Sequence, residues 1–233
     1  MAPDPRALAK SIDHTLLKPT AKDADIRQLC AEAAEEQFAS VCIPPAYVPA
    51  AAKELRGTGV DVATVVSFPL GYDPTAVKVA AVREAIDAGA VELDMVLNVS
   101  QLLSGASAYV GDELAAVVEA ASAASDPGSP ALVKVIIETA YLDEALKREA
   151  TRLVADSGAA FVKTSTGFAP SGATVADVAL LRAEAPSSLQ VKASGGIRTL
   201  GDARAMLDAG ATRLGVSSGV AIIAEAKEQG LAE

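Results

Sequence analysis

Short apolar runs alternate with longer amphipathic segments along the chain, and this alternation restricts the fold more than any other feature of the sequence. Most of the runs are continuously apolar, as parallel strands covered on both faces are. Eight such runs are predicted strands, at residues 11–14, 40–43, 60–68, 90–98, 132–138, 161–166, 190–194 and 213–217. The pattern predicts an α/β fold, a single-domain (β/α)8 TIM barrel over residues 1–233. A doubly wound open sheet is the alternative.

A repeated dipeptide favours the barrel over the open sheet. Val-Lys recurs with its lysine at Lys134, Lys163 and Lys192, and these lysines are 29 residues apart each time. One eighth of the 233 residues is also about 29, close to the length of one strand–loop–helix–loop unit. The three lysines are therefore expected at related positions on successive strands.

Three predicted helices end alike, and the strands that follow them can be aligned on these ends. The sequence Asp-x-Gly-Ala surrounds Gly89, Gly158 and Gly210. Five residues after each glycine come Asp94, Lys163 and Gly215. If the three turns match, these residues hold equivalent positions on alternate strands, which supply one layer of a barrel interior. The phasing therefore predicts that the side chains of Asp94 and Lys163 point into one cavity.

Composition excludes several classes of function. The formal net charge is −10 and aromatic residues make up only 3% of the chain. Such a chain offers neither a basic stripe nor a stacking platform, so nucleic-acid binding and attachment to anionic membranes are not expected. No apolar run approaches the ~18 residues of a membrane span, and the first residues do not read as a signal peptide. A cytoplasmic protein is expected.

Metal chemistry is also disfavoured by the residue counts. The chain holds two cysteines and one histidine, too few for a tetrahedral Cys/His zinc site without a carboxylate ligand. No Cys-x-x-Cys, His-x-His or His-Glu-x-x-His spacing occurs. A metal-dependent aldolase or protease is therefore not expected.

The three lysines within apolar strands are the strongest chemical signal. A lysine is almost never fully buried without a partner, so each could reach water or pair with Asp94 or Glu138. The other interpretation is amine catalysis, which needs an uncharged lysine and hence a pKa lowered by about three units from ~10.4. An apolar pocket and a neighbouring cation lower it. Lys163, between Lys134 and Lys192, has this layout.

Two late loops have the composition of an anion site. Residues 194–198 read Ser-Gly-Gly-Ile-Arg and follow the seventh predicted strand. Residues 215–219 read Gly-Val-Ser-Ser-Gly and lead into a helix. In barrels these two loops commonly bind phosphate through backbone N–H groups and a helix N-terminus. The alternative is that both are tight turns that need small residues.

Taken together, these segments closely resemble the deoxyribose-phosphate aldolase family, from residue 12 to about residue 219. The match lies in IDHTLLKPT at 12–20, VCIP at 41–44, ELDMVLN at 92–98, VKVIIET at 133–139, VKTSTGF at 162–168, VKASGGIR at 191–198 and GVSS at 215–218. The resemblance implies a class I aldolase that uses no metal and no other cofactor. Such an enzyme reversibly cleaves 2-deoxy-D-ribose 5-phosphate to D-glyceraldehyde 3-phosphate and acetaldehyde through a lysine Schiff base, and it is a homodimer or a tetramer.

The resemblance also implies a role for each matching residue. Lys163 forms the Schiff base, Lys192 lowers its pKa and shuttles protons, Asp94 exchanges protons through a water, and Lys134 supports this group. The phosphate is held by Gly167, Gly196, Ile197, Gly215, Ser217 and Ser218. The sugar hydroxyls lie near Thr15 and Thr166.

Two departures from the family and two alternatives stand beside this interpretation. Phe168 occupies a place where some members carry a lysine near the phosphate, so one cation is missing. The chain ends at residues 230–233 without the tyrosine of some longer members, so no contribution of the tail is expected. One alternative is another Schiff-base aldolase, acting on a keto sugar acid or a ketose phosphate. The other is a non-catalytic sugar-phosphate-binding barrel whose lysines are counter-ions.

Overall fold

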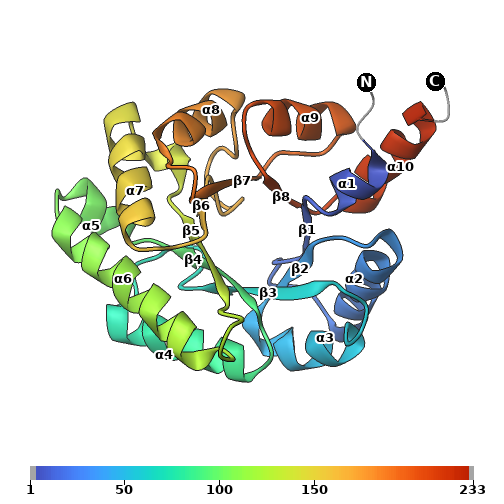
Figure 1. Ribbon diagram of the computed structural model, residues 1–233, viewed down its shortest axis with the longest axis horizontal. Helices are drawn as coiled ribbons and strands as arrows, with labels where there is room; N and C mark the ends of the chain where they lie inside the picture. The colour runs from blue at the N-terminus through green and yellow to red at the C-terminus, as the bar shows by residue number, and fades with distance from the viewer. Residues whose placement is uncertain (1–3, 231–233) are drawn as a thin grey trace.

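Eight parallel strands close into a barrel in the computed structural model, which describes residues 4–230. Each strand pairs with its two neighbours in chain order, and β1 pairs with β8. The strands are β1 (Ile12–Thr15), β2 (Ser40–Ile43), β3 (Asp61–Val66), β4 (Glu92–Val96), β5 (Leu132–Ile136), β6 (Phe161–Lys163), β7 (Gln190–Ser194) and β8 (Arg213–Val216). The predicted (β/α)8 TIM barrel is confirmed, and the open sheet is wrong (Figure 1).

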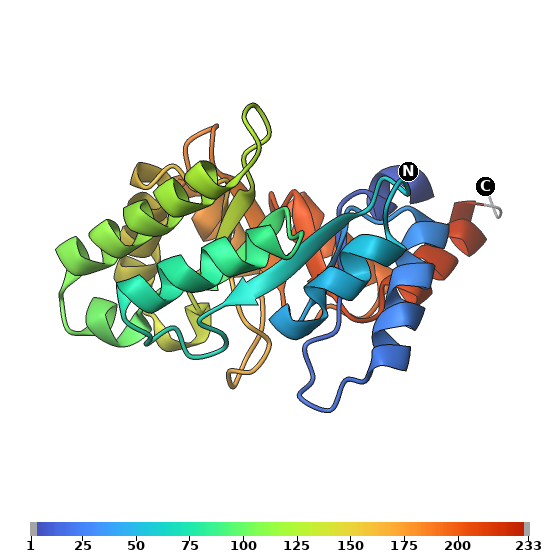
Figure 2. The same ribbon diagram turned by 90° about the horizontal axis from the view of Figure 1, so that it is seen from below.

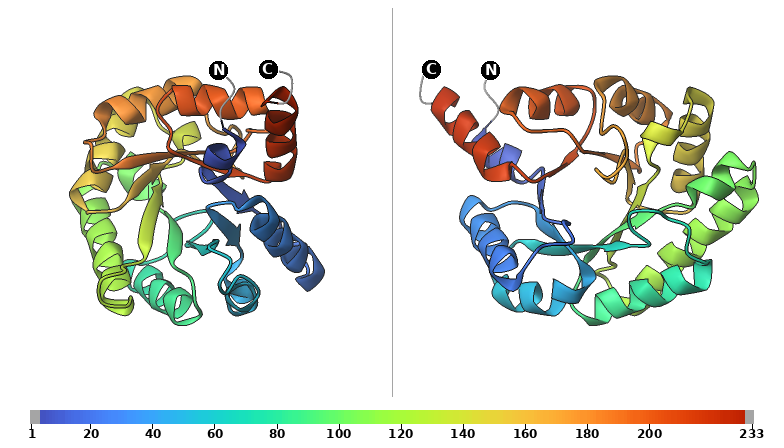
Figure 3. Two further views of the ribbon diagram at one scale, coloured as in Figure 1. Left: turned by 45° about the vertical axis from the view of Figure 1, so that its right-hand side comes forward. Right: turned by 180° about the vertical axis from the view of Figure 1, so that it is seen from behind.

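Helices surround the barrel (Figure 1). They are α1 (Pro5–Ala9), α2 (Asp23–Glu36), α3 (Val48–Glu54), α4 (Thr75–Asp87), α5 (Val99–Leu103), α6 (Ser107–Ala124), α7 (Glu144–Asp156), α8 (Val175–Glu184), α9 (Leu200–Asp208) and α10 (Gly219–Gly230), with short 3-10 turns η1 (Pro45–Tyr47) and η2 (Thr139–Tyr141). Helices α1 and α10 lie side by side (Figure 3). Within residues 4–230, no helix combines the length and apolarity needed to cross a membrane.

Side chains fix where the helices after β6 and β7 begin. The hydroxyl of Thr174 accepts a hydrogen bond from the Asp177 N–H at 3.0 Å, before α8. The hydroxyl of Thr199 accepts one from the Asp202 N–H at 3.1 Å, before α9. Each bond satisfies a backbone donor that the first helical turn leaves free. The loops between these strands and helices are therefore anchored at both ends.

Several predicted strands are too long at their carboxyl ends. The runs 60–68 and 132–138 end as strands at Val66 and Ile136. Ser67 and Glu138 both have a φ of 53°, a left-handed conformation that does not continue a strand. The run 161–166 ends at Lys163. Ile137 and residues 164–166 lie beyond these strand ends and are still buried, so a buried run in the sequence overestimates the length of the strand.

The interior of the barrel has an apolar part and a charged part. Cys42, Ala63 and Val65 form a small buried cluster inside the barrel, against which Leu17 and Phe68 pack. The larger apolar core lies between the outer face of the strands and the helices. Strands β2 and β3 thus supply an apolar wall, and the charged side chains inside the barrel come from the other six strands.

The two ends of the barrel differ in their loops. Figure 2 shows the loops after β1 and β6 projecting from one end, where the strands terminate, while the loop at residues 125–131 projects from the other. Functional residues of such barrels lie at the carboxyl ends of the strands. This end therefore carries the candidate site.

Candidate active site

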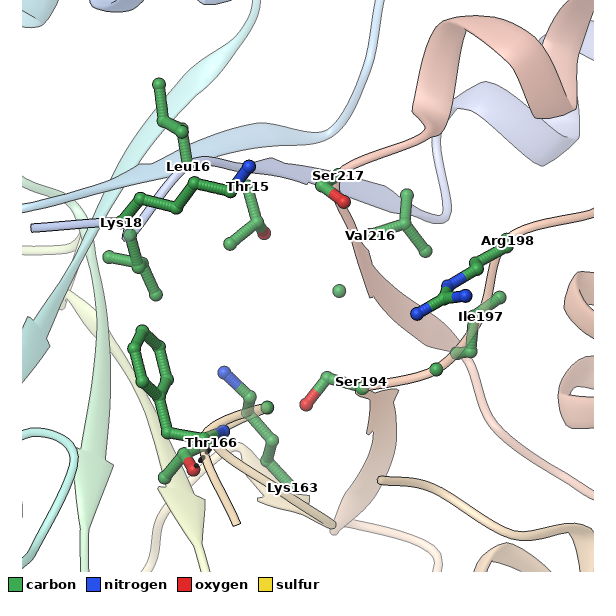
Figure 4. A pocket seen from close by; sticks show the side chains of 16 residues that line it. Thr15, Leu16, Lys18, Lys163, Thr166, Ser194, Ile197, Arg198, Val216 and Ser217 are labelled. Carbon is green, nitrogen blue, oxygen red and sulfur yellow. Dashed lines mark hydrogen bonds between the residues drawn. The ribbon is translucent and has the colours of Figure 1, made fainter. Parts of the chain in front are cut away.

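Lys163, the last residue of β6, faces a cavity at the carboxyl ends of the strands (Figure 4). The cavity has a volume of about 360 Å³. Its lining consists of Thr15, Leu16, Leu17, Lys18, Lys163, Thr166, Gly167, Phe168, Ser194, Gly195, Gly196, Ile197, Arg198, Gly215, Val216 and Ser217. Lys163 is 3% exposed, and of the three strand lysines it alone reaches this lining. A small molecule in the cavity therefore meets the amine of Lys163 first.

Asp94, on β4, contacts Lys163 from inside the barrel. The Lys163 Nζ lies 2.6 Å from the Asp94 Oδ2. The spacing of the sequence predicts that these two side chains share one cavity, and the structure places them in contact. Lys163 therefore has a carboxylate on one side and open space on the other.

Lys134 and Lys192 are fully buried and lie deeper in the barrel. The Lys192 Nζ is 2.6 Å from the Asp94 Oδ2 and 2.5 Å from the Asp13 Oδ2. The Lys134 Nζ contacts three carboxylates: Glu92 at 2.6 Å, Asp13 at 3.0 Å and Asp94 at 3.1 Å. The predicted grouping of three lysines around Asp94 is thus present, together with two acids that sequence reasoning missed.

The three lysines differ in the direction of their pKa shifts. Burial lowers the pKa of Lys163; Asp94 opposes this shift, and the positive charge of Lys192 adds to it. Burial also disfavours the charged form of Lys192, but Asp13 and Asp94 outweigh it and hold its pKa above the usual value. The pKa of Lys134 is likewise raised by its carboxylates in spite of burial. Lys163 is therefore the lysine poised to be an uncharged amine.

Asp94 is held as a carboxylate. Burial alone would raise its pKa, but the charges of Lys134, Lys163 and Lys192 lower it far below its usual range. Such a group accepts hydrogen bonds strongly and holds a proton only transiently. The site thus combines an uncharged amine, a carboxylate and an adjacent ammonium group.

Glycine-rich loops form the opposite wall of the cavity. Gly195 and Gly196, after β7, have φ angles of 86° and 84°, a conformation that favours glycine. At Gly215 a Cβ atom would lie 2.9 Å from the Cβ of Ser194 and 3.2 Å from the Cε of Lys192. A side chain there would press against the lysine chain, so the glycine keeps the backbone close to the site.

The residues expected to hold phosphate gather on this wall. Gly167, Gly196, Ile197, Gly215 and Ser217 line the cavity. Ser218 is the next residue, immediately before the first turn of α10, and lies beside this lining. A helix N-terminus and exposed backbone N–H groups favour an anion.

Two cations at the cavity were not singled out from the sequence for this role. Lys18 and Arg198 are exposed residues in loops after β1 and β7, and both line the cavity. Figure 4 shows the guanidinium group of Arg198 directed into the cavity. Phe168, which stands where some family members have lysine, is 53% exposed and packs edge-on against Phe68 with 5.4 Å between ring centres. The cavity therefore has positive charge in spite of Phe168.

The two threonines expected near the sugar differ in their partners. The hydroxyl of Thr15 donates to the carbonyl oxygen of Asp13 at 2.9 Å. The hydroxyl of Thr166 donates to the carboxylate of Glu138 and accepts from the Phe168 N–H at 3.0 Å. Both threonines line the cavity, and Glu138 fixes the orientation of Thr166.

Asp13, Glu92 and Arg213 complete the charged interior without having been predicted. The Arg213 Nη1 lies 2.6 Å from the Asp13 Oδ1 and 3.2 Å from the Glu92 Oε1. A period of two could have revealed two of them, because Glu92 precedes Asp94, and Arg213 precedes Gly215, by two residues on the same strand. Asp13 carried a signal of its own, as an acid within a buried strand.

The carboxylates of Asp13, Glu92 and Asp94 contact ammonium and guanidinium groups. Across residues 4–230, no group of three or more His, Cys, Asp and Glu side chains is arranged to hold a metal ion. Neighbouring cations also oppose the approach of another cation. The metal-free reaction stays a prediction. The prediction about the carboxyl-terminal tail falls partly on residues 231–233, which lie outside the described residues.

Comparison with known proteins agrees with this geometry. Residues 7–225 match the family described as DeoC/LacD family aldolase. The chain is 51% identical over 224 residues to the deoxyribose-phosphate aldolase of Caldanaerobacter subterraneus, covering 96% of this chain and 95% of that protein. It is 49% identical over 217 residues to that of Bacillus subtilis, covering 93% and 95%. The tetrameric deoxyribose-phosphate aldolase structure from Aeropyrum pernix matches with a TM-score of 0.88 and 35% identity, over 97% of this chain and 93% of that one.

Proposed function

The chain belongs to the DeoC/LacD family of aldolases, and from this premise we propose how its residues carry out the reaction. It is a carbon–carbon lyase that reversibly cleaves 2-deoxy-D-ribose 5-phosphate to D-glyceraldehyde 3-phosphate and acetaldehyde. Lys163 forms the Schiff base. The observation that carries this assignment is that Lys163 alone of the three strand lysines both reaches the cavity and has a lowered pKa.

The reaction begins at the aldehyde carbon of the open-chain sugar phosphate. The uncharged Lys163 Nζ adds to this carbon, and the adduct takes up a proton and loses water to give a protonated imine. The imine draws electrons from the bond between C2 and C3, which otherwise would leave a poorly stabilised carbanion at C2. Because the amine already lies at the cavity wall, this electron sink is placed next to the bond that breaks.

Cleavage requires the hydroxyl proton of C3 to leave as the C2–C3 bond breaks. We assign the accepting role to Asp94, acting through a water, since three lysines keep it ionised. The products of this step are glyceraldehyde 3-phosphate and an enamine on Lys163. Lys192, which is protonated in the resting enzyme, exchanges protons with the site through Asp94, whose Oδ2 lies 2.6 Å from the Lys192 Nζ. The enamine carbon takes up a proton, and water then hydrolyses the imine to release acetaldehyde.

The phosphate group is assigned to the glycine-rich wall. Gly167, Gly196, Ile197, Gly215, Ser217 and Ser218 offer backbone and hydroxyl donors, and Arg198 and Lys18 offer positive charge. These charges lie at the cavity itself, where they offset the net charge of −10 on the whole chain. Thr15 and Thr166 are assigned to the sugar hydroxyls, and Lys134 to holding Asp94.

Reductive trapping tests the assignment of Lys163. The protein is treated with acetaldehyde and borohydride, digested and analysed by mass spectrometry. We expect an ethyl group on Lys163, and its absence from the matched variant Lys163→Arg. An adduct spread over exposed lysines, or none, contradicts the Schiff base and supports the non-catalytic sugar-phosphate-binding barrel.

A panel of donors tests the substrate. Turnover with acetaldehyde as donor, and little with pyruvate or dihydroxyacetone, supports the proposed reaction; the reverse pattern supports another Schiff-base aldolase. The homodimer, with a tetramer as the alternative, and the cytoplasmic location stay predictions that rest on the family resemblance. Light scattering of the purified protein measures the first.

A further inference from the structure

Seven charged side chains form one continuous buried group, which we call the barrel charge network. Each belongs to a different strand except for Glu92 and Asp94, which share β4. The members are Asp13, Glu92, Asp94, Lys134, Lys163, Lys192 and Arg213, connected by nitrogen–oxygen distances of 2.5–3.2 Å. The side chain of Arg213 is 15% exposed, and the other six are at most 3% exposed.

The network contains three carboxylates and four basic groups. A net charge in a buried region carries a large desolvation cost, so a buried group of ions tends towards neutrality. Three cations balance three carboxylates, and a fourth cation would be in excess. One basic group in this network is therefore the one that gives up its proton.

The contacts identify that group. Arginine keeps its proton in proteins. Lys134 contacts three carboxylates and Lys192 contacts two, whereas Lys163 contacts Asp94 alone. Lys163 loses the least attraction on becoming neutral, and its amine is the one at the cavity.

We propose that Arg213 and Glu92 are positioning residues that set the charge of Lys163 from the far side of the network, by fixing its balance of positive and negative groups. Neither residue lines the cavity, so neither contacts the substrate. Arg213 contacts Asp13 and Glu92, Asp13 contacts Lys192, and Lys192 contacts Asp94, the partner of Lys163. The inference rests on the proposed function, since it concerns the amine that forms the Schiff base.

Three other titratable groups near the network add no charge to its three carboxylates and four basic groups. Burial raises the pKa of the Cys42 thiol, on β2, to about 11, so it stays neutral. Burial also raises the pKa of Glu138, whose carboxylate is bonded to Thr166. Asp61, at the start of β3, is exposed to solvent, and its pKa is raised by partial burial and by Glu92. No salt bridge joins these three to the network in the described part of the chain.

We expect the acidic limb of the pH profile of kcat/KM to shift in opposite directions in two variants. Arg213→Met removes a positive charge, which leaves the network negative and favours the protonated Lys163. Its acidic limb is expected to move to higher pH by about half to one pH unit. Glu92→Gln removes a negative charge and is expected to move the limb to lower pH by a similar amount. The limb reports the free enzyme's essential base.

Two further variants separate charge from geometry. Arg213→Lys keeps the charge and loses the planar guanidinium, and its acidic limb is expected to match that of the wild type. The double variant Arg213→Met with Glu92→Gln removes one charge of each sign and is expected to return the limb to its original position. A purely structural role for Arg213 lowers activity in both substitutions and moves the limb in neither.

Trapping in each variant distinguishes this inference from the proposed function. The pH dependence of ethyl transfer to Lys163 with acetaldehyde and borohydride is expected to follow the same opposite shifts. Trapping at Lys163 with limbs that stay in place, or that move in the same direction, overturns the charge-balance inference and leaves the Schiff base intact. Loss of trapping in the wild type itself overturns the proposed function. A variant that does not fold, as judged by circular dichroism, is replaced by Arg213→Gln or Glu92→Met with the same expected signs.

Discussion

The deeply buried interior of the barrel, here called its floor, and the cavity at its mouth each hold a lysine, and the two lysines differ in their tendency to be protonated. Lys163 and Lys192 are direct partners in the register of β6 and β7, and both are buried. Lys192, in the floor, contacts two carboxylates and has a raised pKa. Lys163, at the mouth, contacts one carboxylate and open space, and has a lowered pKa. Burial alone therefore does not decide the charge of a lysine here; the number of anionic partners does.

The largest expected effect comes from removing the cation that separates the two states. In Lys192→Met, Lys163 loses its positive neighbour, so its pKa rises and the acidic limb of the pH profile moves to higher pH. Loss of the proton donor is also expected to lower kcat by about 10²–10⁴-fold. Steady-state kinetics across pH measure both. An acidic limb that does not move contradicts the role of Lys192 in lowering the pKa of Lys163. The control substitution is Lys53→Met, on the outer helix α3.

A substitution in the floor tests how much of the fold depends on paired charges. Asp13→Asn removes the one carboxylate that contacts all three of Lys134, Lys192 and Arg213. Breaking a buried ion pair in this way costs about 3–5 kcal/mol of folding stability. A lower free energy of unfolding in urea is expected at neutral pH.

The loss of stability in Asp13→Asn is expected to depend on pH. Lysine and arginine charges hold the pKa of Asp13 well below its usual value in the folded protein, in spite of burial. Its contribution to stability is therefore present above the unfolded pKa of ~3.9 and is lost as the pH falls through the lower folded pKa. The difference between wild type and Asp13→Asn is expected to shrink below about pH 4. A constant difference down to acid unfolding contradicts this ionic account.

The smallest effect is expected at the mouth, where charges are exposed. Arg198→Met is expected to raise KM for the phosphorylated substrate by about 5–20-fold, because a charge-assisted hydrogen bond contributes about 1–2 kcal/mol. The kcat for an unphosphorylated aldehyde pair is expected to stay near that of the wild type. Ser218→Ala, beside the cavity, is the matched comparison and is expected to change KM less. Equal losses with both substrates contradict the assignment of Arg198 to the phosphate.

The barrel and the pairing of Asp94 with Lys163 could be predicted from the sequence because both follow from patterns that repeat along the chain. The eight apolar runs gave eight strands, and the spacing around Gly89 and Gly158 brought Asp94 and Lys163 to one place. Strand ends were less predictable, since the left-handed backbone at Ser67 and Glu138 is not marked by a glycine in the sequence. The local pattern of apolar residues therefore predicts that a strand exists, but it does not predict the residue at which the strand ends.

The choice among the lysines could not be made from spacing. Each of the three follows a valine in an apolar strand, so their local sequences are alike. The difference arises from Asp13, a partner that lies 179 residues away from Lys192 in the chain and reaches it only when the barrel closes. Arg198 and Lys18 likewise come to one cavity from loops at opposite ends of the sequence.

Side-chain NMR of isotopically labelled lysine tests the uncharged state of Lys163 most directly. The Cε and Nζ signals report protonation, and lysine-to-arginine variants assign them. Lys163 is expected to lose its proton below the ordinary lysine pKa of about 10.4, while Lys192 and Lys134 remain protonated beyond it. A Lys163 that stays protonated as long as an exposed lysine, or a Lys192 that loses its proton first, contradicts the account.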